Sequence, residues 1–184
     1  MHTLHFFFSS LNSRHFNLLL KIILLVGLFF RIFHFFYNRS LWIDEIYLSS
    51  SIIKFNLKEL ATIPLLYQQK APIGFLLIVK LMVNTFGNSE ISLRIFPLIC
   101  GIASIFLFVP VAKHFLSSLP ALLAISILCF SPALIYHSVE IKQYSTDLFA
   151  AILSLYTFIK MQNKRDLKSM MLWSLVGALT IWFS

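Results

Sequence analysis

Long apolar stretches alternate with shorter polar ones along most of the chain, and their lengths predict membrane-spanning helices. A helix needs about 20 mostly apolar residues to cross the hydrocarbon core of a bilayer. On this basis we expect spans at residues 16–37, 93–112, 116–136, 144–161 and 169–184. Lys21 and Arg31 lie in the first of them, and we expect both to extend toward the membrane faces. The predicted fold class is all-α, a polytopic transmembrane helix bundle.

Residues 38–92 form a long segment between the first two predicted spans. Its first part places Leu48, Ile52 and Phe55 at helical spacing beside polar residues, which is typical of a helix lying in the membrane interface. Its second part, residues 71–87, is short for a span and has Lys80 at its centre. We predict two interfacial helices in an outer loop, the second of which could be re-entrant. If the second instead spans the membrane, every later topology prediction is reversed.

The composition supports a membrane protein and changes how the charge is interpreted. The chain is 59% hydrophobic and only 12% charged, whereas a soluble domain would carry about twice that charge. The net charge of +8 therefore indicates residues that set topology and meet anionic lipid. Because no basic run is interleaved with aromatic residues in a polar context, we do not expect nucleic acid as a partner.

The two chain ends and the two cysteines each support one structural prediction. Residues 1–17 lack a small-residue cleavage site, which favours an uncleaved anchor over a signal peptide. Cys100 and Cys129 lie inside apolar stretches without metal-ligand spacing, so we expect buried thiols. The sequence reaches residue 184 within an apolar stretch. This predicts the N-terminal portion of a longer protein.

The basic residues of the short loops predict the orientation. The loop after the fourth predicted span carries Lys160, Lys164, Arg165 and Lys168, whereas the turn after the third carries only Lys142. Since short cytoplasmic loops are enriched in Lys and Arg, the N-terminus is expected to be cytoplasmic. Residues 38–92 and the turn with Glu140 then both face outward.

The candidate chemistry lies on this outer face. Asp44 and Glu45 are adjacent in a chain with only seven acidic residues, and Glu140 is predicted to emerge on the same face. Carboxylates there can act as a general base, hold a divalent cation or bind a cationic substrate, and Lys70 can hold a phosphate. For each of these residues, the alternative that it is simply a polar residue of an ordinary loop stays open. Asp147 lies a turn inside the fourth span, so it is either functional or stabilised by water and the helix dipole.

The ordered motifs "WIDE", "QQKAPIGFLL", "SEISLRIFPL" and "SVEIKQYS" resemble the N-terminal part of GT-C type glycosyltransferases. That group includes protein O-mannosyltransferases, aminoarabinose transferases and the bacterial RgtA/B/C/D-like members of family 39. The resemblance implies Asp44 as the usual candidate for the catalytic base and Lys70 near the lipid phosphate. Two departures are visible: Ala71 replaces the first proline of a Lys-Pro-Pro-like start, and Lys142 replaces an arginine.

The resemblance implies a glycosyltransferase, or the N-terminal part of one. It would move a sugar from a polyprenyl-phosphate donor to an acceptor at the outer face of the bacterial plasma membrane, in the cell envelope. The catalytic candidates are Asp44, Glu45 and Glu140, and the substrate-binding candidates are Lys70, Arg94, Lys142 and Tyr144. No spacing requires a cofactor, although paired carboxylates would allow a divalent cation. The other expected partners are the lipid bilayer, an unknown acceptor and a chain that supplies further spans.

Two further classes of function remain open at this point. The chain could be a non-catalytic membrane fragment or a subunit that binds lipid or a partner chain. A transporter would be expected to show paired, interrupted helices at mid-membrane depth, and the sequence shows no such pair.

Overall fold

The computed structural model describes residues 13–164 and 166–183. The predicted anchor therefore lies partly outside the described residues, which begin at Ser13. Within the described chain all regular structure is helical, which confirms the predicted fold class. In chain order the helices are α2 (Ser13–Tyr37), α3 (Ile43–Lys54), α4 (Leu57–Thr62), the 3-10 turn η1 (Leu66–Gln68), α5 (Ile73–Phe86), α6 (Glu90–Phe115), α7 (Ser118–Phe130), α8 (Pro132–His137), α9 (Tyr144–Met161) and α10 (Leu167–Phe183).

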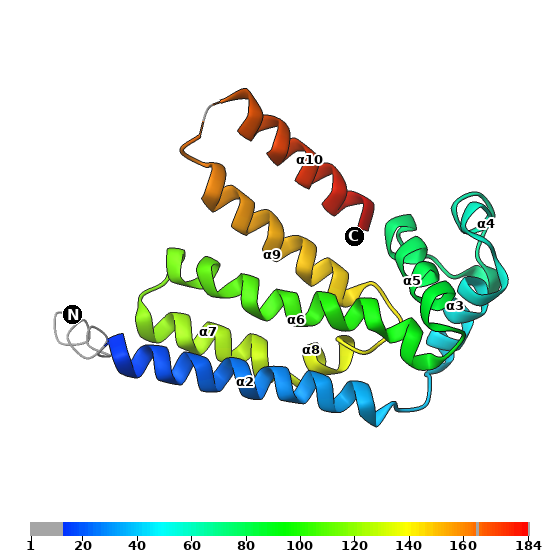
Figure 1. The fold of residues 1–184 in the computed structure, drawn as a ribbon, viewed down its shortest axis with the longest axis horizontal. Coiled ribbons are helices and arrows are strands. Elements are labelled where there is room, and N and C mark those ends of the chain that lie inside the picture. The colour runs from blue at the N-terminus through cyan, green and yellow to red at the C-terminus, as the bar shows by residue number, and fades with distance from the viewer. Residues whose placement is uncertain (1–12, 165, 184) are drawn as a thin grey trace.

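The long helices lie side by side around α6, which contacts α2, α7 and α9. Helices α3, α4 and α5 gather at one end of this bundle, where α2 ends and where α6 and α9 begin (Figure 1). We call this the site end; it comprises residues 38–92 and 137–143. The opposite end contains the connections from α6 to α7 and from α9 to α10 (Figure 1).

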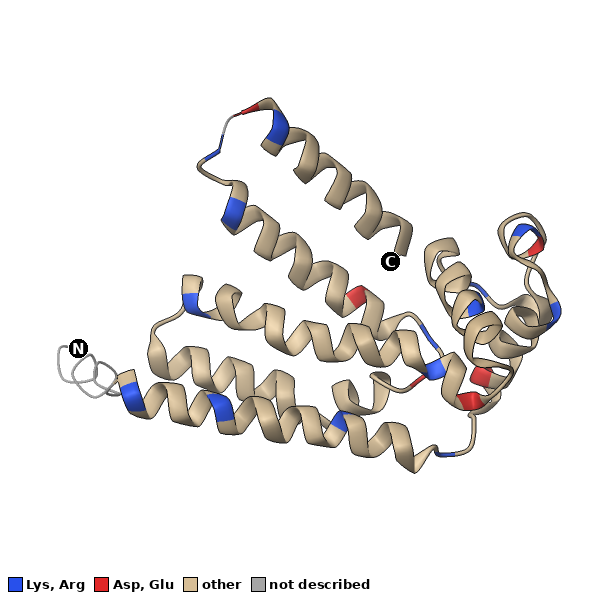
Figure 2. Ribbon diagram, viewed as in Figure 1, with Lys and Arg blue, Asp and Glu red and all other residues tan. Residues whose placement is uncertain are grey.

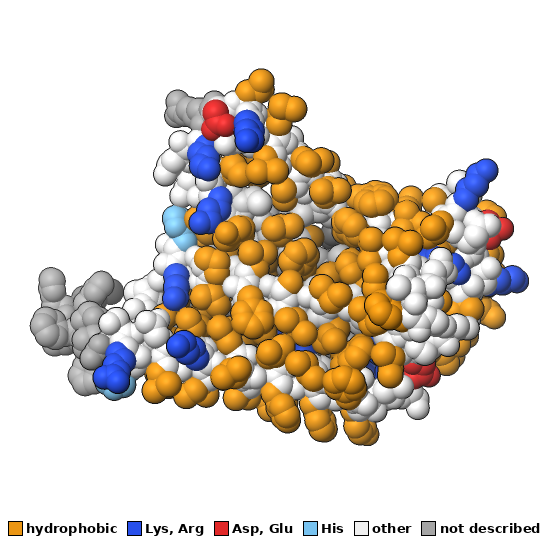
Figure 3. All heavy atoms as spheres, viewed as in Figure 1, with side chains coloured by type: hydrophobic (Ala, Val, Ile, Leu, Met, Phe, Trp, Pro, Cys, Tyr) orange, Lys and Arg blue, Asp and Glu red, His pale blue; other side chains and the backbone are white. Residues whose placement is uncertain are grey.

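The distribution of side chains is that of a helical membrane bundle. Helices α2 and α6 are long and apolar enough to cross a membrane, and α5, α7 and α10 are shorter apolar helices. Apart from those on α2, most charged residues lie toward the two ends of the bundle (Figure 2). The face shown in Figure 3 carries a broad band of hydrophobic side chains between these ends. Such a band has the character needed to face lipid.

The predicted span at 116–136 is not one continuous helix. It is divided into α7 and α8 at Ser131. Proline at position 132 has no backbone N–H, so the carbonyl of Leu128 cannot receive its usual helical hydrogen bond. Arg31 from α2 donates instead, from Nη2 to Leu128 O at 3.0 Å and from Nη1 to Cys129 O at 3.1 Å.

The prediction that Arg31 extends toward the membrane face is therefore wrong. Its side chain is completely buried, and both of its Nη atoms donate to carbonyl groups at the end of α7 inside the bundle. Gly27, one turn earlier on α2, allows this approach. A Cβ atom at Gly27 would lie only 2.8 Å from the Cβ of Cys129, so a larger residue there would push α2 and α7 apart. Lys21 is exposed, and its extension toward a membrane face stays a prediction.

The segment after α2 contains one more interruption between helices than the hydrophobic pattern predicts. The first predicted interfacial helix is divided into α3 and α4 at Phe55 and Asn56, because Asn56 accepts from the Glu59 backbone N–H as an N-cap. Helix α5 occupies the second predicted helix, between Pro72 and Gly87. Lys80 from α5 donates to Ile52 O and Ile53 O in the last turn of α3, at 2.9 and 3.1 Å. This contact fixes α5 against the end of α3.

Candidate functional site

Two adjacent carboxylates at the start of α3 have opposite environments. Successive helical residues are rotated by about 100°, so Asp44 and Glu45 point in different directions. Asp44 is exposed and makes no hydrogen bond or ion pair with another described residue. Glu45 is completely buried. Of the pair, Asp44 is the carboxylate that a molecule from outside can reach.

Glu45 connects parts of the chain that are far apart in sequence. Its Oε2 accepts from the backbone N–H of Trp42 at 2.9 Å and from Arg39 Nη1 at 2.8 Å. Its Oε1 accepts from the backbone N–H of Ile141 at 2.9 Å. The carboxylate therefore caps the first turn of α3 and at the same time holds the segment before α9.

Arg94 is directed into the protein rather than toward solvent. It lies near the start of α6 and is completely buried. Its Nη1 donates to Asn38 Oδ1 and its Nη2 to the carbonyl of Arg39, both at 2.6 Å. These bonds fix the link between α2 and α3. The adjacent Arg39 guanidinium lies 4.2 Å from the ring centre of Tyr136, a cation–π contact that joins this link to α8.

The turn between α8 and α9 brings Glu140 together with a histidine. Glu140 is largely buried, and its Oε2 lies 2.5 Å from Nδ1 of His137. The ring of His137 lies 4.6 Å from the ring of Tyr144, measured between centres. Tyr144 itself is about half exposed. Sequence reasoning did not select His137; its place three residues before Glu140 in "HSVE" is the signal that could have identified it.

This turn is held closely against α6. A Cβ atom at Gly101 would lie 2.7 Å from the Cβ of Ser138, so only glycine fits there without displacing the turn. Ser145 Oγ donates to the carbonyl of His137 at 2.8 Å. Together with the bond from Ile141 to Glu45, these contacts fix the positions of the side chains that the turn carries.

The loop before α5 brings the two candidate lysines near one another in the fold. Lys142 Nζ donates to Gln69 Oε1 at 2.8 Å, and Lys70 follows Gln69 directly in the chain. Lys70 is exposed, and no described residue forms a hydrogen bond or ion pair with it. An exposed ammonium group without such a partner is suited to binding a phosphate.

The same loop has an unusual backbone. Tyr67 and Gln68 both have positive φ angles, of 55° and 56°, a conformation that L-residues adopt at a cost. Tyr67 is retained there by its ring, which stacks on Tyr47 of α3 at 4.4 Å. Ser51 Oγ also accepts from the backbone N–H of Leu66 at 3.0 Å. Helix α3 thus holds the strained turn that precedes Lys70.

The site end therefore unites three of the predicted segments through direct hydrogen bonds: the start of α3, the loop before α5 and the turn before α9. Asp147, in the first turn of α9, is partly buried. Among the described residues, no group of three or more His, Cys, Asp and Glu side chains is arranged to hold a metal ion.

These features define a helical membrane protein in which hydrogen bonds join the candidate segments at one end of the bundle. The sequence of residues 70–183 matches the family described as dolichyl-phosphate-mannose-protein mannosyltransferase. The match covers more than half of the chain, and the chain belongs to this family, which is of glycosyltransferase type. It is an integral membrane protein. No curated protein matches the chain, and no solved structure does.

The matched region includes some candidate residues and leaves out others. Lys70, Arg94, Glu140, Lys142 and Tyr144 lie within it. The Asp44–Glu45 pair precedes it. The bond between Glu45 and Ile141 links the pair physically to the matched region.

Proposed function

We propose that this protein transfers a sugar from a polyprenyl-phosphate donor to an acceptor, at the site end of the bundle. The observation that carries the proposal is that the start of α3, where Asp44 is exposed, is hydrogen-bonded through Glu45 to the turn before α9, and this turn through Lys142 to the loop that carries Lys70. A polyprenyl chain is apolar and would lie in the bilayer. Its phosphate and sugar would then be at the depth of the bundle end, where these charged groups are found.

The proposed reaction is a single displacement at the anomeric carbon of the donor sugar. Asp44 accepts the proton of the acceptor hydroxyl, and the acceptor oxygen forms a bond to the anomeric carbon. The bond from that carbon to the phosphate oxygen breaks, and the electron pair leaves with the polyprenyl phosphate. One base and one leaving group suffice, and the configuration at the anomeric carbon is inverted.

The basic residues stabilise the leaving group in this proposal. The exposed ammonium of Lys70 contacts the phosphate, and Lys142 adds a second positive charge from the turn before α9. Tyr144 borders the sugar, and Glu140 orients the acceptor through its contact with His137. Glu45 and Arg94 keep the segments in place from the interior, since both are completely buried.

The proposed orientation places the reaction outside the cell. Residues 160–168, around the connection from α9 to α10 at the opposite end, contain four basic residues and one acidic residue, which favours a cytoplasmic location for that end. The N-terminus would then be cytoplasmic and the site end would face outward. We propose the bacterial plasma membrane as the location, on the resemblance to the bacterial members of the group.

The donor class can be tested with a synthetic polyprenyl phosphate that carries tritiated mannose, the sugar in the family description. Membranes from cells that express the protein supply both enzyme and acceptors. We expect label to move from the lipid fraction to lipid-free material. Membranes with Asp44→Asn should show no transfer, whereas those with Asp166→Asn, the same change at an exposed residue of the opposite end, should retain it.

Two outcomes would contradict the proposal. Transfer from a nucleotide sugar but not from the lipid-linked sugar would exclude the donor class. Equal transfer in the presence and absence of the protein, with lipid-linked mannose, glucose and arabinose each tried as donor, would exclude the activity.

A further inference from the structure

A concave region lies at the opposite end of the bundle, away from Asp44 and Lys142. It is a hollow of about 720 Å³ between the end of α9 and the start of α10. Its volume is within the range of about 300–1,000 Å³ that small-molecule sites occupy. The proposed transfer reaction uses none of its residues.

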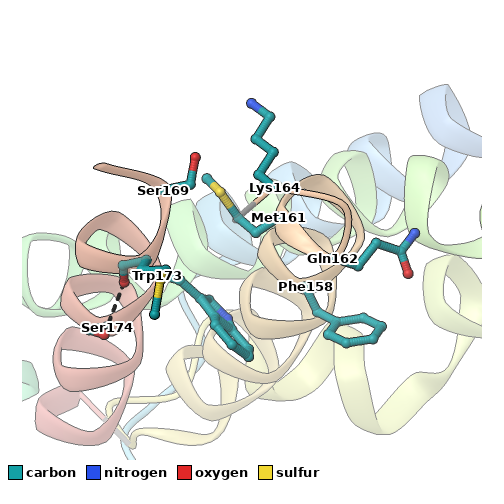
Figure 4. Close-up of a pocket in the computed structure, with 8 residues that line it drawn as sticks. Phe158, Met161, Gln162, Lys164, Ser169, Trp173 and Ser174 are labelled. Carbon is teal, nitrogen blue, oxygen red and sulfur yellow. Dashed lines mark hydrogen bonds between the residues drawn. The ribbon is translucent and has the colours of Figure 1, made fainter. Parts of the chain in front are cut away.

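The lining of the hollow is polar at one end and apolar at the other. Figure 4 shows the amino group of Lys164 and the hydroxyl of Ser169 at one end of the group of side chains, and the rings of Trp173 and Phe158 toward the other. Met170 also lines it. A polar end that leads into an apolar interior matches the shape of an amphiphile, whose head group is polar and whose chains are not.

The charge around the polar end favours an anion. The described residues between 160 and 169 include three lysines and one acidic residue, Asp166. Hydrogen bonds from the Ser169 hydroxyl and backbone N–H lower the pKa of Asp166, so its carboxylate is charged at neutral pH. Both of its oxygens are already used by Ser169, at 2.8 and 3.0 Å, in capping α10. Lys164 lines the hollow; its charge also helps to lower the pKa of Asp166, but no hydrogen bond to a described residue holds its amino group.

The aromatic residues fix the depth of the hollow in the bilayer. Tryptophan is enriched where the hydrocarbon meets the lipid head groups, and Trp173 is about half exposed. It lies little more than one turn after Ser169 on α10. A tryptophan at this position favours head-group level for the basic end of the hollow, about one turn away, and acyl-chain level for the residues beyond it.

We propose that this hollow binds an anionic phospholipid of the bilayer. The phosphate head group contacts Lys164, and the upper part of an acyl chain lies against Trp173, Phe158 and Met170. The site is separate from the sugar-transfer site and does not depend on the proposed activity.

The chain offers a direct reporter, because it contains three tryptophans and only Trp173 lines the hollow. A full-length variant with Trp42→Phe and Trp182→Phe is placed in nanodiscs that contain lipids brominated near the head group. Brominated phosphatidylglycerol should quench Trp173 fluorescence at a lower mole fraction than brominated phosphatidylcholine. Lys164→Gln should reduce this preference about fivefold, the effect of one lysine near an anionic surface.

Lys160→Gln provides the matched control. It removes the same charge from the same end, but Lys160 lies over the ring of Tyr156, 5.6 Å from its centre, and does not line the hollow. The preference should persist in this variant. Equal quenching by the two lipids would overturn the proposal, because the hollow would then hold bilayer lipid without selection. An equal loss of preference in both lysine variants would also overturn it, because the selectivity would belong to the whole basic end.

Discussion

At the scale of residues, the decisive feature is that Asp44 and Glu45, although adjacent, have different environments and therefore different expected roles. The sequence shows two adjacent carboxylates and predicts chemistry for both. The structure gives one carboxylate three hydrogen bonds inside the protein and leaves the other exposed. Which of the two is buried depends on Arg39 and on the backbone of Ile141, a residue 96 positions away. No local pattern could have indicated that partner.

Because Glu45 is buried and Asp44 is exposed, we expect their substitutions to have different effects on stability. Glu45→Gln removes the charge that Arg39 and two backbone N–H groups share, and each bond to a charged group contributes about 1.5–3 kcal/mol. We expect a clear fall in the free energy of unfolding, measured by circular dichroism of the protein in nanodiscs. Asp44→Asn should leave it unchanged. An equal loss in both variants would contradict the structural role of Glu45.

Lys70 permits a second prediction at this scale. Lys70→Gln removes an exposed ammonium that we place on the donor phosphate, so kcat/KM for the lipid-linked sugar should fall by about tenfold or more. Lys58→Gln is the matched control, since Lys58 is also exposed and lies in the same outer segment. The prediction fails if the two variants have the same kcat/KM.

At the scale of elements, the lengths of the apolar stretches predicted where the helices lie. Individual side-chain contacts determine where a helix is interrupted. The long apolar stretches gave α2, α6 and α9 close to their observed bounds. The division between α7 and α8 was not predicted, although Pro132 was visible. A proline break needs a donor for the carbonyl that it frees, and here that donor is Arg31, from a helix almost 100 residues earlier. The sequence alone does not show that pairing.

The hydrogen bonds from Arg31 to the end of α7 predict the effect of replacing Arg31. Arg31→Met leaves the carbonyls of Leu128 and Cys129 without donors in the bundle, so stability should fall by about 3 kcal/mol. Lys21→Met, an exposed position on the same helix, should have little effect. Thermal unfolding in nanodiscs measures both.

A compensating change makes the mechanism specific. Pro132→Ala restores a backbone N–H opposite the carbonyl of Leu128, so it should recover part of the stability lost in Arg31→Met. If the double variant is no more stable than Arg31→Met alone, the carbonyl of Leu128 is not the group that needs the arginine.

At the scale of the whole molecule, the bundle separates two ends of different character. The site end joins residues 38–92 to the turn before α9, and the opposite end carries the basic residues around the connection from α9 to α10 (Figure 2). Counting spans along the sequence placed Asp44, Lys70 and Glu140 on one face, and the structure groups their segments at one end. The charge pattern indicates which end faces the cytoplasm, and this stays a prediction.

Cysteine labelling tests that orientation. Cys100 and Cys129 are buried and can be replaced by alanine to give a background without thiols. On this background, Asn88→Cys at the site end should react with a membrane-impermeant maleimide added to intact cells. Asn163→Cys at the opposite end should react only after permeabilisation. The reverse pattern would place the site end in the cytoplasm.

The central claim is that Asp44 is the base of a sugar-transfer site. The most direct measurement is the single-turnover rate of transfer from the lipid-linked sugar by purified full-length protein in nanodiscs, compared with Asp44→Asn and Asp166→Asn. General base catalysis contributes about 10²–10⁴-fold. We therefore predict a loss of that size in Asp44→Asn, with unchanged donor affinity and unchanged unfolding, and a normal rate in Asp166→Asn. A rate in Asp44→Asn within about twofold of wild type, well below the effect of removing a base, would show that the proton of the acceptor leaves by another route.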